Sequence, residues 1–228
     1  MMLVTAIVLA FTLSGALPLP ESALSKDLGS PEIRFSFEHP QLDPSAYTLV
    51  IREDGSGHYR SSPGPSSGPG MDGFASSASE RDITVRDPLL ATLFQTARSH
   101  RYFAIECESP DTRIAFTGKK TVAYAGSDGS GQCSYNYSRD KELNQLAEDL
   151  MAIAYTLYEG NRLALEHQHS RLSLDSELES LQSAVKDHRA LEIENIAPVL
   201  EAIAEDPAVM NRARKRAQLL LNVDASKH

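Results

Sequence analysis

The sequence predicts an α+β protein in which an antiparallel sheet with one covering helix is followed by a C-terminal helical extension of three to four helices. Two observations lead to this fold class. Between residues 31 and 138, short segments alternate apolar and polar side chains with a period of two, which is typical of half-buried strands. From residue 139 to residue 228, apolar side chains recur three and four positions apart, which is typical of amphipathic helices.

An uncharged apolar segment opens the chain. It runs from Leu3 to Ala16, which is shorter than the about 20 residues of a membrane-spanning helix and fits a signal-peptide core. Ser14 and Ala16 are small residues at the two positions that a signal peptidase reads, so we expect residues 1–16 to be a cleaved signal peptide. Because no Lys or Arg precedes the segment, a buried N-terminal strand or helix, or an uncleaved anchor, remains an alternative. Residues 17–30 lack periodicity and are expected to be a flexible tether.

Alternating side chains predict several strands before the first helix. The Asp54-Gly55 pair predicts a hairpin turn, because glycine readily adopts the positive φ that such a turn needs. Residues 61–79 are rich in Ser, Gly and Pro and are expected to be a mobile loop, either a plain spacer or a lid over a site. The segments expected to be strands are residues 32–38, 47–52, 58–60 and 81–86.

One helix and a further group of strands complete this α+β region. Asp87 and Pro88 are a typical helix start, and the apolar residues between Leu89 and Ala97 fall on one face of the helix that follows. The segments expected to be strands after this helix are residues 102–107 and a hairpin of residues 113–116 and 121–124 across a turn at Gly118 and Lys119.

The region from residue 139 onward is expected to be a helical region that ends at residue 228. Its apolar stripes have helical spacing, and residues that commonly cap or start helices separate them. The expected helices are a long one over residues 140–166, which Gly160 and Asn161 end or interrupt, one at the capping box of Ser176 and Glu179, a short one capped by Asn195, and a last one started by Asp206 and Pro207.

The chain contains two cysteines, Cys107 and Cys133. Export would bring them into an oxidising compartment, where two cysteines are expected to pair. The resulting disulfide would stabilise the fold by about 3.5 kcal/mol in the chain-entropy model. Two free buried thiols are the alternative. A redox or metal centre is not expected, because there is no CxxC motif and no histidine nearby in the sequence.

Composition and motifs favour binding over catalysis. The net charge of −9 repels nucleic-acid phosphates, so we expect no nucleic-acid partner. No Gly-x-Ser-x-Gly elbow is present, and the glycine-rich residues 126–131 lack the Lys-Ser/Thr pair of a phosphate-binding loop. His167 and His169 lie two positions apart, on different faces of a helix, and Asp128 alone is far from a calcium site. Glu106 and Glu108 would share a solvated strand face. We therefore expect neither metal nor cofactor.

A basic cluster near the C-terminus is the candidate interaction site. It follows a region in which acidic residues outnumber basic ones, and it would meet an anionic lipid or an acidic partner. The alternative is that these cations complement the helix dipole and pair with acidic neighbouring helices. The residues of the cluster are Arg212, Arg214, Lys215 and Arg216.

The first region resembles a family of uncharacterised secreted bacterial domains. The resemblance spans about Ala46 to Tyr158. It lies in the order of a strand, the Asp54-Gly55 turn, a flexible segment, a strand, a helix starting at Asp87-Pro88 and the Gly118-Lys119 hairpin. It implies a secreted α+β domain and supplies no activity.

The end of the chain is similar to a single HEAT-repeat unit. Asp206-Pro207-Ala208-Val209, followed by Ala213 and Ala217, is similar to the second helix of such a unit, and residues 196–204 would be its first helix. One unit does not make an array, because HEAT repeats bury their faces against neighbouring units. We therefore expect a helical hairpin without a binding surface taken from the family.

Together these features lead us to expect an exported, periplasmic or secreted protein of a bacterial envelope, with no membrane span after cleavage. Its expected role is that of a non-catalytic protein-interaction module with a protein partner. The alternative is a small hydrolase or an enzyme-binding domain with a site on the sheet face beneath residues 61–79. There a serine, His58 and a carboxylate would come together.

Overall fold

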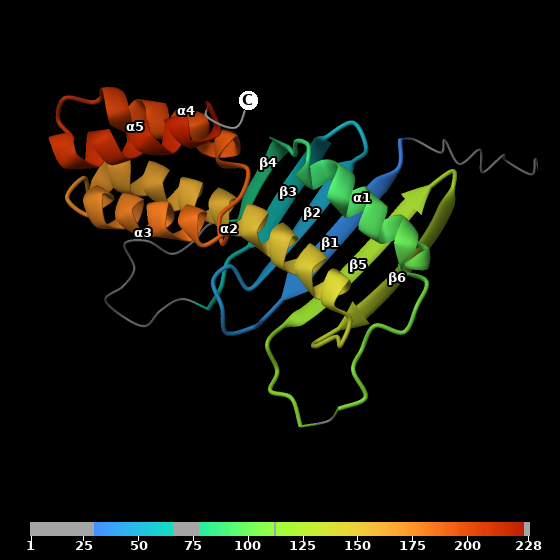
Figure 1. The fold of residues 1–228 in the computed structure, drawn as a ribbon. Coiled ribbons are helices and arrows are strands. Elements are labelled where there is room, and N and C mark those ends of the chain that lie inside the picture. Colours follow the sequence, from blue (N-terminus) through green and yellow to red (C-terminus); the bar gives the residue numbers. More distant parts are fainter. Residues whose placement is uncertain (1–29, 66–77, 112, 226–228) are drawn as a thin grey trace, which may run out of the picture.

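The computed structural model describes residues 30–65, 78–111 and 113–225 (Figure 1). The expected signal peptide of residues 1–16, nearly all of the tether and the centre of the 61–79 loop lie outside the described residues. Within the described part of the chain, no helix combines the length and the apolar character needed to span a membrane.

Six antiparallel strands form one sheet in the order β4-β3-β2-β1-β5-β6 (Figure 1). Among the described elements, one α-helix lies in the chain between β4 and β5 and four follow the last strand, which confirms the predicted α+β class. The strands are β1 (Glu32–Glu38), β2 (Ala46–Arg52), β3 (Ser56–Ser62), β4 (Ser79–Thr84), β5 (Lys119–Gly126) and β6 (Gly129–Tyr135).

Alternation along the strands gives the sheet one buried face and one open face. Phe35 lies between Leu49 of β2 and Val122 of β5 in the strand register, and all three side chains are fully buried. The intervening positions, such as Arg34 and Arg60, point to the exposed side, because successive side chains of a strand point to opposite faces. The period of two in the sequence therefore predicted correctly which face forms the core.

Five α-helices and two short 3-10 helices complete the described structure. The helices α3, α4 and α5 lie together with the second half of α2, beyond the sheet (Figure 1). The elements are α1 (Leu89–Ser99), η1 (Arg101–Phe103), α2 (Lys141–His169), α3 (Leu174–Lys186), η2 (Ile193–Ile196), α4 (Ala197–Glu205) and α5 (Asn211–Ala225).

The prediction of a single covering helix is wrong, because two helices cover the buried face. Both α1 and the first half of α2 lie across the sheet (Figure 1). Leu143, Leu150 and Leu157 of α2 belong to the same hydrophobic cluster as the buried strand residues. Six strands at about 4.8 Å spacing span roughly 25 Å, whereas one helix with its side chains covers only about 10 Å. One helix would leave most of this apolar face exposed to water.

The helix α2 continues through Gly160 and Asn161, where we expected it to end or be interrupted. A Cβ atom at Gly160 would lie 2.3 Å from Cγ2 of Ile196, which is far inside van der Waals contact. Gly160 therefore allows η2 to pack closely against the middle of α2. The glycine marks a contact between helices and not a helix end.

We predict that Gly160→Ala destabilises the protein by about 1–2 kcal/mol, because the added methyl group overpacks the contact with Ile196. At an ordinary helix position the same substitution would stabilise by roughly 0.5–1 kcal/mol. Urea unfolding of the wild type, both single variants and the double variant with Ile196→Ala measures the coupling between the two sites. An increase in stability for Gly160→Ala alone would contradict the proposed contact.

Residues 101–118 differ most from the sequence predictions, since neither residues 102–107 nor residues 113–116 form a strand. Arg101, Tyr102 and Phe103 have φ angles of 54°, 59° and 65°, so the chain makes a left-handed turn there. Such a turn costs free energy at non-glycine residues. The complete burial of Phe103 contributes to offsetting this cost.

The hairpin lies one segment later in the chain than predicted, between β5 and β6. The glycine-rich residues 126–131 form the end of β5, the turn and the start of β6. A Cβ atom at Gly131 would lie 2.7 Å from the carbonyl oxygen of Tyr102, and one at Gly129 would overlap the Tyr102 ring. These glycines let the left-handed turn pack directly on β6.

Three helix starts also differ from the predictions. Helix α3 begins before Ser176, and α5 begins several residues after Asp206. The carboxylate of Asp206 instead accepts a hydrogen bond from the backbone of Ala208 (2.8 Å) and pairs with His167 (2.9 Å). Asn195 does not cap α4. Its amide bonds the backbone of Thr84 at the end of β4, donating to the carbonyl at 2.9 Å and accepting from N–H at 2.8 Å.

Candidate functional site

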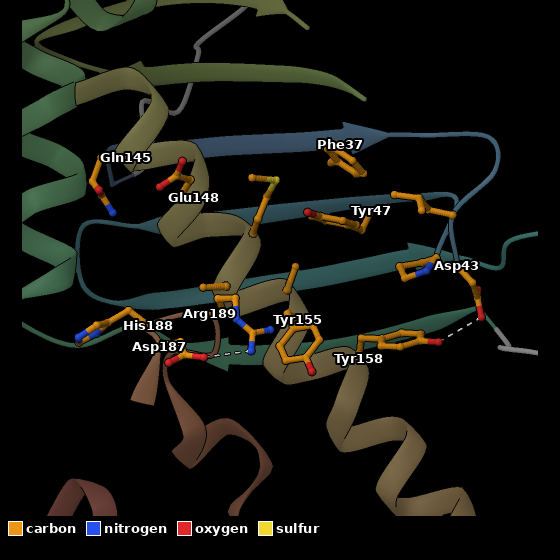
Figure 2. A pocket seen from close by; sticks show the side chains of 15 residues that line it. Phe37, Asp43, Tyr47, Gln145, Glu148, Tyr155, Tyr158, Asp187, His188 and Arg189 are labelled. Carbon is orange, nitrogen blue, oxygen red and sulfur yellow. Dashed lines mark hydrogen bonds and ion pairs between the residues drawn. The ribbon is translucent and has the colours of Figure 1, made fainter. Parts of the chain in front are cut away.

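A groove of about 800 Å³ runs between α2, the loop from β1 to β2, and the residues that follow α3 (Figure 2). We call it the α2 groove. Its apolar lining comes from both strands and helix, and its polar residues are spread along it. The aromatic and aliphatic residues of the lining include Phe37, Leu42, Pro44, Tyr47, Met151, Tyr155 and Tyr158, and the polar ones are Asp43, Gln145, Glu148, Asp187, His188 and Arg189.

Two stacked rings line the sheet side of the α2 groove. Phe37 of β1 and Tyr47 of β2 lie opposite each other in the strand register. Their ring centroids are 5.3 Å apart with an angle of 27° between the planes. Because both strands alternate in the same register, the last inward-facing residue of β1 and the first of β2 meet at this end of the sheet.

Asp43 holds the β1–β2 loop in place at one end of the groove. Its Oδ2 accepts a hydrogen bond from the hydroxyl of Tyr158 (3.2 Å), and its Oδ1 accepts one from the backbone of Gly64 (2.9 Å). Burial, together with the nearby carboxylate, raises the pKa of Tyr158 to about 12. Tyr158 therefore stays a neutral donor near neutral pH and ties α2 to the loop.

The hydroxyl of Tyr47 points toward α2, into the groove (Figure 2). The residue is 9% exposed, and the hydroxyl makes no hydrogen bond to any described residue. Burial raises the pKa of Tyr47 far above its usual value, so the group is a neutral O–H. Tyr59 lies next to it, with ring centroids 6.2 Å apart, and its buried hydroxyl also has no hydrogen-bond partner among the described residues. Tyr59 does not line the groove.

The charges around the groove leave it acidic. Arg189 pairs with Asp187 at 3.3 Å, which neutralises the cation on the α3 side. Glu148 is exposed on α2 and forms no ion pair with any described residue. It lines the groove together with Gln145 and Tyr47 (Figure 2). A ligand that enters the groove therefore meets a carboxylate that no described cation neutralises.

The predicted disulfide is confirmed. Cys107 and Cys133 are bonded, with their Cα atoms 5.9 Å apart. Both residues are buried, at 5% and 8% exposure, so the bond is shielded from solvent. It fastens the segment that follows η1 to β6. Its place in the core indicates a structural role.

Three of the four residues in the predicted basic cluster hold the helices together. Arg212 and Arg216 both bind the buried carboxylate of Asp175, at 2.5 Å and 3.0 Å, and lower its pKa. Arg214 donates to the carbonyl oxygen of Ala204 at 2.9 Å. Lys215 is exposed and pairs with no described residue. This arrangement fastens α5 to α3 and α4.

His58 lies on the open face of the sheet, between two carboxylates. Its Nδ1 is 3.0 Å from Asp82 and its Nε2 is 2.9 Å from Glu80. Both ring nitrogens are therefore occupied, whereas a general base needs a free lone pair beside its nucleophile. No serine among the described residues forms a hydrogen bond with His58.

We predict that the pKa of His58 lies above its usual value of about 6.5, because the hydrogen bonds to Asp82 and Glu80 favour the imidazolium form. The resulting small stabilisation is present below the unfolded pKa and is lost as the pH rises through the folded pKa. An NMR titration of the His58 ring measures this shift. Asp82→Asn should lower the pKa, and the control Asp187→Asn should not. A His58 pKa that Asp82→Asn leaves unchanged would contradict the assignment.

Two of the other carboxylates considered from the sequence have structural contacts, whereas Glu106 is exposed and does not lie on a strand. Asp128 accepts hydrogen bonds from Arg98 (2.9 Å) and from the Tyr124 hydroxyl (2.7 Å) at the β5–β6 turn. Glu108 accepts one from the backbone of Asn136 (2.6 Å). In the part of the chain that the structure describes, no group of three His, Cys, Asp or Glu side chains is placed to hold a metal ion.

The sequence analysis missed the α2 groove. Its residues come from segments that are far apart in the chain. The helical spacing of Gln145, Glu148, Met151, Tyr155 and Tyr158 shows only that these five share one side of a helix. No protein-family model matches this chain, and no curated protein matches it either. The geometry of the groove is therefore the basis for assigning a function.

Proposed function

We propose that this protein is an exported, non-catalytic interaction module and that its α2 groove receives an apolar segment of a protein partner. The observation that carries the proposal is the groove itself, an aromatic and aliphatic depression of about 800 Å³ with a few polar groups along it. Binding sites have this size and composition, and partners commonly anchor large side chains in such depressions.

Exposed apolar residues extend this surface along the β1–β2 loop. Leu42 at the groove is 47% exposed, and Phe116 is 57% exposed. Phe116 stacks on His39, which begins the same loop, with ring centroids 5.3 Å apart. Apolar surface that continues from a groove onto an exposed rim is typical of protein-interaction sites. The basic cluster on α5 offers less surface, because three of its side chains bind within the protein.

The lining favours binding over covalent chemistry. Among the described residues that line the groove there is no serine, threonine or cysteine to act as a nucleophile. The cation Arg189 is paired with Asp187, and Asp43 binds Tyr158 and Gly64. These contacts shape the groove and do not form a nucleophile–base pair.

Export is part of the proposal and rests on two features. The uncharged segment from Leu3 to Ala16 has the length of a signal-peptide core. The disulfide between Cys107 and Cys133 is of the kind that persists in oxidising compartments. Expression with the native leader in a Gram-negative host, followed by intact mass measurement of the periplasmic fraction, tests this part. We expect a chain that begins at Leu17 and has no free thiol, and a cytosolic product with an intact Met1 would overturn it.

The groove is tested by selecting a displayed heptapeptide library on the mature protein, residues 17–228. We expect selected peptides to carry one or two large apolar residues and to lose at least about tenfold in affinity on Met151→Lys, which places a charge in the groove. The matched control Leu219→Lys changes an exposed leucine on α5, outside the groove, and should bind as the wild type does. Circular dichroism confirms that each variant is folded. Equal binding by Met151→Lys and the wild type would overturn the proposed site.

A further inference from the structure

We infer that the segment bound in the α2 groove combines a large apolar anchor with a neighbouring basic side chain and supplies a hydrogen-bond acceptor to the Tyr47 hydroxyl. This inference rests on the proposed function and specifies the chemistry of the partner. Three features of the groove carry it: a tyrosine hydroxyl that opens into the groove and bonds no described residue, an acidic side chain of the lining without an ion pair among the described residues, and an aromatic surface between the strands and the helix.

The Tyr47 hydroxyl is the first feature. Tyr47 is nine-tenths buried, its O–H points into the groove, and it bonds no described residue (Figure 2). The Tyr47 oxygen is not among the buried unpaired atoms of the described residues, so it is accessible from the groove, where water or a ligand can satisfy it. The ring alone accounts for the stacking on Phe37, which a phenylalanine would provide as well. The hydroxyl is therefore assigned to an acceptor on the bound segment, such as a backbone carbonyl.

The charge of the groove is the second feature. Glu148 lines the groove from α2 and has no ion pair among the described residues. The cation Arg189 pairs with Asp187 and is not available to neutralise Glu148. A bound segment with a carboxylate at this point would be repelled, whereas a lysine or arginine would be attracted. Complementary charge thus selects a basic residue next to the anchor.

The aromatic lining is the third feature. Phe37, Tyr47 and Tyr158 line the space between the strands and α2, and Leu42 is exposed at its edge. Large side chains bind such surfaces by burying apolar area, at about 25 cal/mol for each Å² removed from water. A polypeptide fits this groove better than a short-chain metabolite does, because the apolar surface continues onto the exposed β1–β2 loop.

The test uses the peptides selected on the mature protein, resynthesised with a fluorescent label. The wild type should select peptides in which Lys or Arg lies within two positions of an aromatic or large aliphatic residue. Glu148→Gln should weaken the selected peptide about fivefold at low salt and less at high salt. The same variant should not affect a peptide whose basic residue is replaced by alanine. Tyr47→Phe should weaken binding about fivefold at every salt concentration, while leaving the unfolding free energy unchanged or higher.

Two variants serve as controls. Tyr59→Phe removes the hydroxyl of a neighbouring buried tyrosine that does not line the groove, and Glu201→Gln neutralises an exposed carboxylate on α4. Both should bind within twofold of the wild type. This inference would be overturned, while the proposed function stands, if the peptides that bind in the groove lack basic residues. The same holds if Glu148→Gln and Tyr47→Phe leave the affinity of these peptides unchanged. Selected peptides that ignore Met151→Lys would overturn both. Groove-dependent binding of a cationic amphipathic small molecule in preference to every peptide would overturn the assignment to a polypeptide.

Discussion

Removing the disulfide with the double substitution Cys107→Ala and Cys133→Ala is expected to lower the free energy of unfolding by about 3.5 kcal/mol. The bonded residues are 26 positions apart, so the bond restricts a sizeable loop of the unfolded chain. In the folded state it also holds the segment after the left-handed turn against β6. We expect hydrogen exchange to accelerate first in the residues next to Cys107, because they form no strand and the bond fastens them to β6.

Urea unfolding monitored by circular dichroism measures this loss of stability. The wild type in a strong thiol reductant should approach the stability of the double variant. The double variant should be insensitive to the reductant, which provides the control. A loss below about 1 kcal/mol would contradict the assigned structural role, because it is far smaller than the stabilisation usual for a native disulfide.

The variant Arg162→Met is expected to lose about 2 kcal/mol of stability at pH 7, because it leaves buried carboxylates without their cation. Arg162 pairs with two buried carboxylates, Glu159 at 3.2 Å and Glu166 at 3.6 Å, and with the partly exposed Glu177 at 3.0 Å. Glu159 and Glu166 are only 5% and 8% exposed, between α2 and α3. Burial already raises the pKa of both carboxyl groups, and removal of the guanidinium raises them further.

The loss in Arg162→Met should shrink as the pH falls. A carboxyl group whose folded pKa lies above its unfolded value binds more protons in the folded state between those two values. Stability therefore decreases as the pH rises through that range and recovers as the pH falls toward the unfolded pKa of about 4.3. Unfolding free energies measured from pH 7 to pH 4.5 give this profile.

Two further variants make the test specific to the buried cluster. Adding Glu159→Gln to Arg162→Met should restore part of the stability at pH 7, because it removes one uncompensated charge. The matched control Arg189→Met breaks a pair whose side chains are 60% and 61% exposed, and it should cost less than about 0.5 kcal/mol. If Arg162→Met lowers the free energy of unfolding by the same amount at pH 7 and at pH 4.5, this account is contradicted.

The sequence predicted the structure correctly where a regular spacing of apolar residues indicates which side chains are buried. The alternation in residues 32–38 predicted β1 with its correct inward face, because every second side chain is apolar. The helical spacing of Leu143, Leu150 and Leu157 predicted α2 in the same way. The disulfide followed from the pairing expected of two cysteines in an exported chain.

The hairpin β5–β6 was placed incorrectly because glycines interrupt the alternation of apolar and polar side chains in β6. Gly129 and Gly131 occupy inward positions of β6 but carry no side chain, so the stretch resembles a loop. The left-handed turn at Arg101 to Phe103 was also not predictable, since none of these residues is a glycine or asparagine. That turn depends on tertiary contacts with β6, which no local pattern contains.

The candidate site was not predictable for a different reason. The groove joins Tyr47 of a strand, Asp43 of a loop and Glu148 of a helix, and their proximity depends on how α2 crosses the sheet. The basic cluster shows the reverse situation. Arg212 and Arg216 are conspicuous in the sequence, but their partner Asp175 lies in another helix, and charge patterns along a chain do not identify such partners.

The bond between Asn195 and the end of β4 has a consequence for behaviour at high concentration. β4 is an edge strand of the sheet. The unpaired backbone groups of an edge strand can bind a strand of another molecule, and repeated addition of strands leads to fibrils. At Thr84 the side-chain amide of Asn195 occupies both backbone groups as an added strand would. The helical half of the protein thereby shields this end of the strand from self-association.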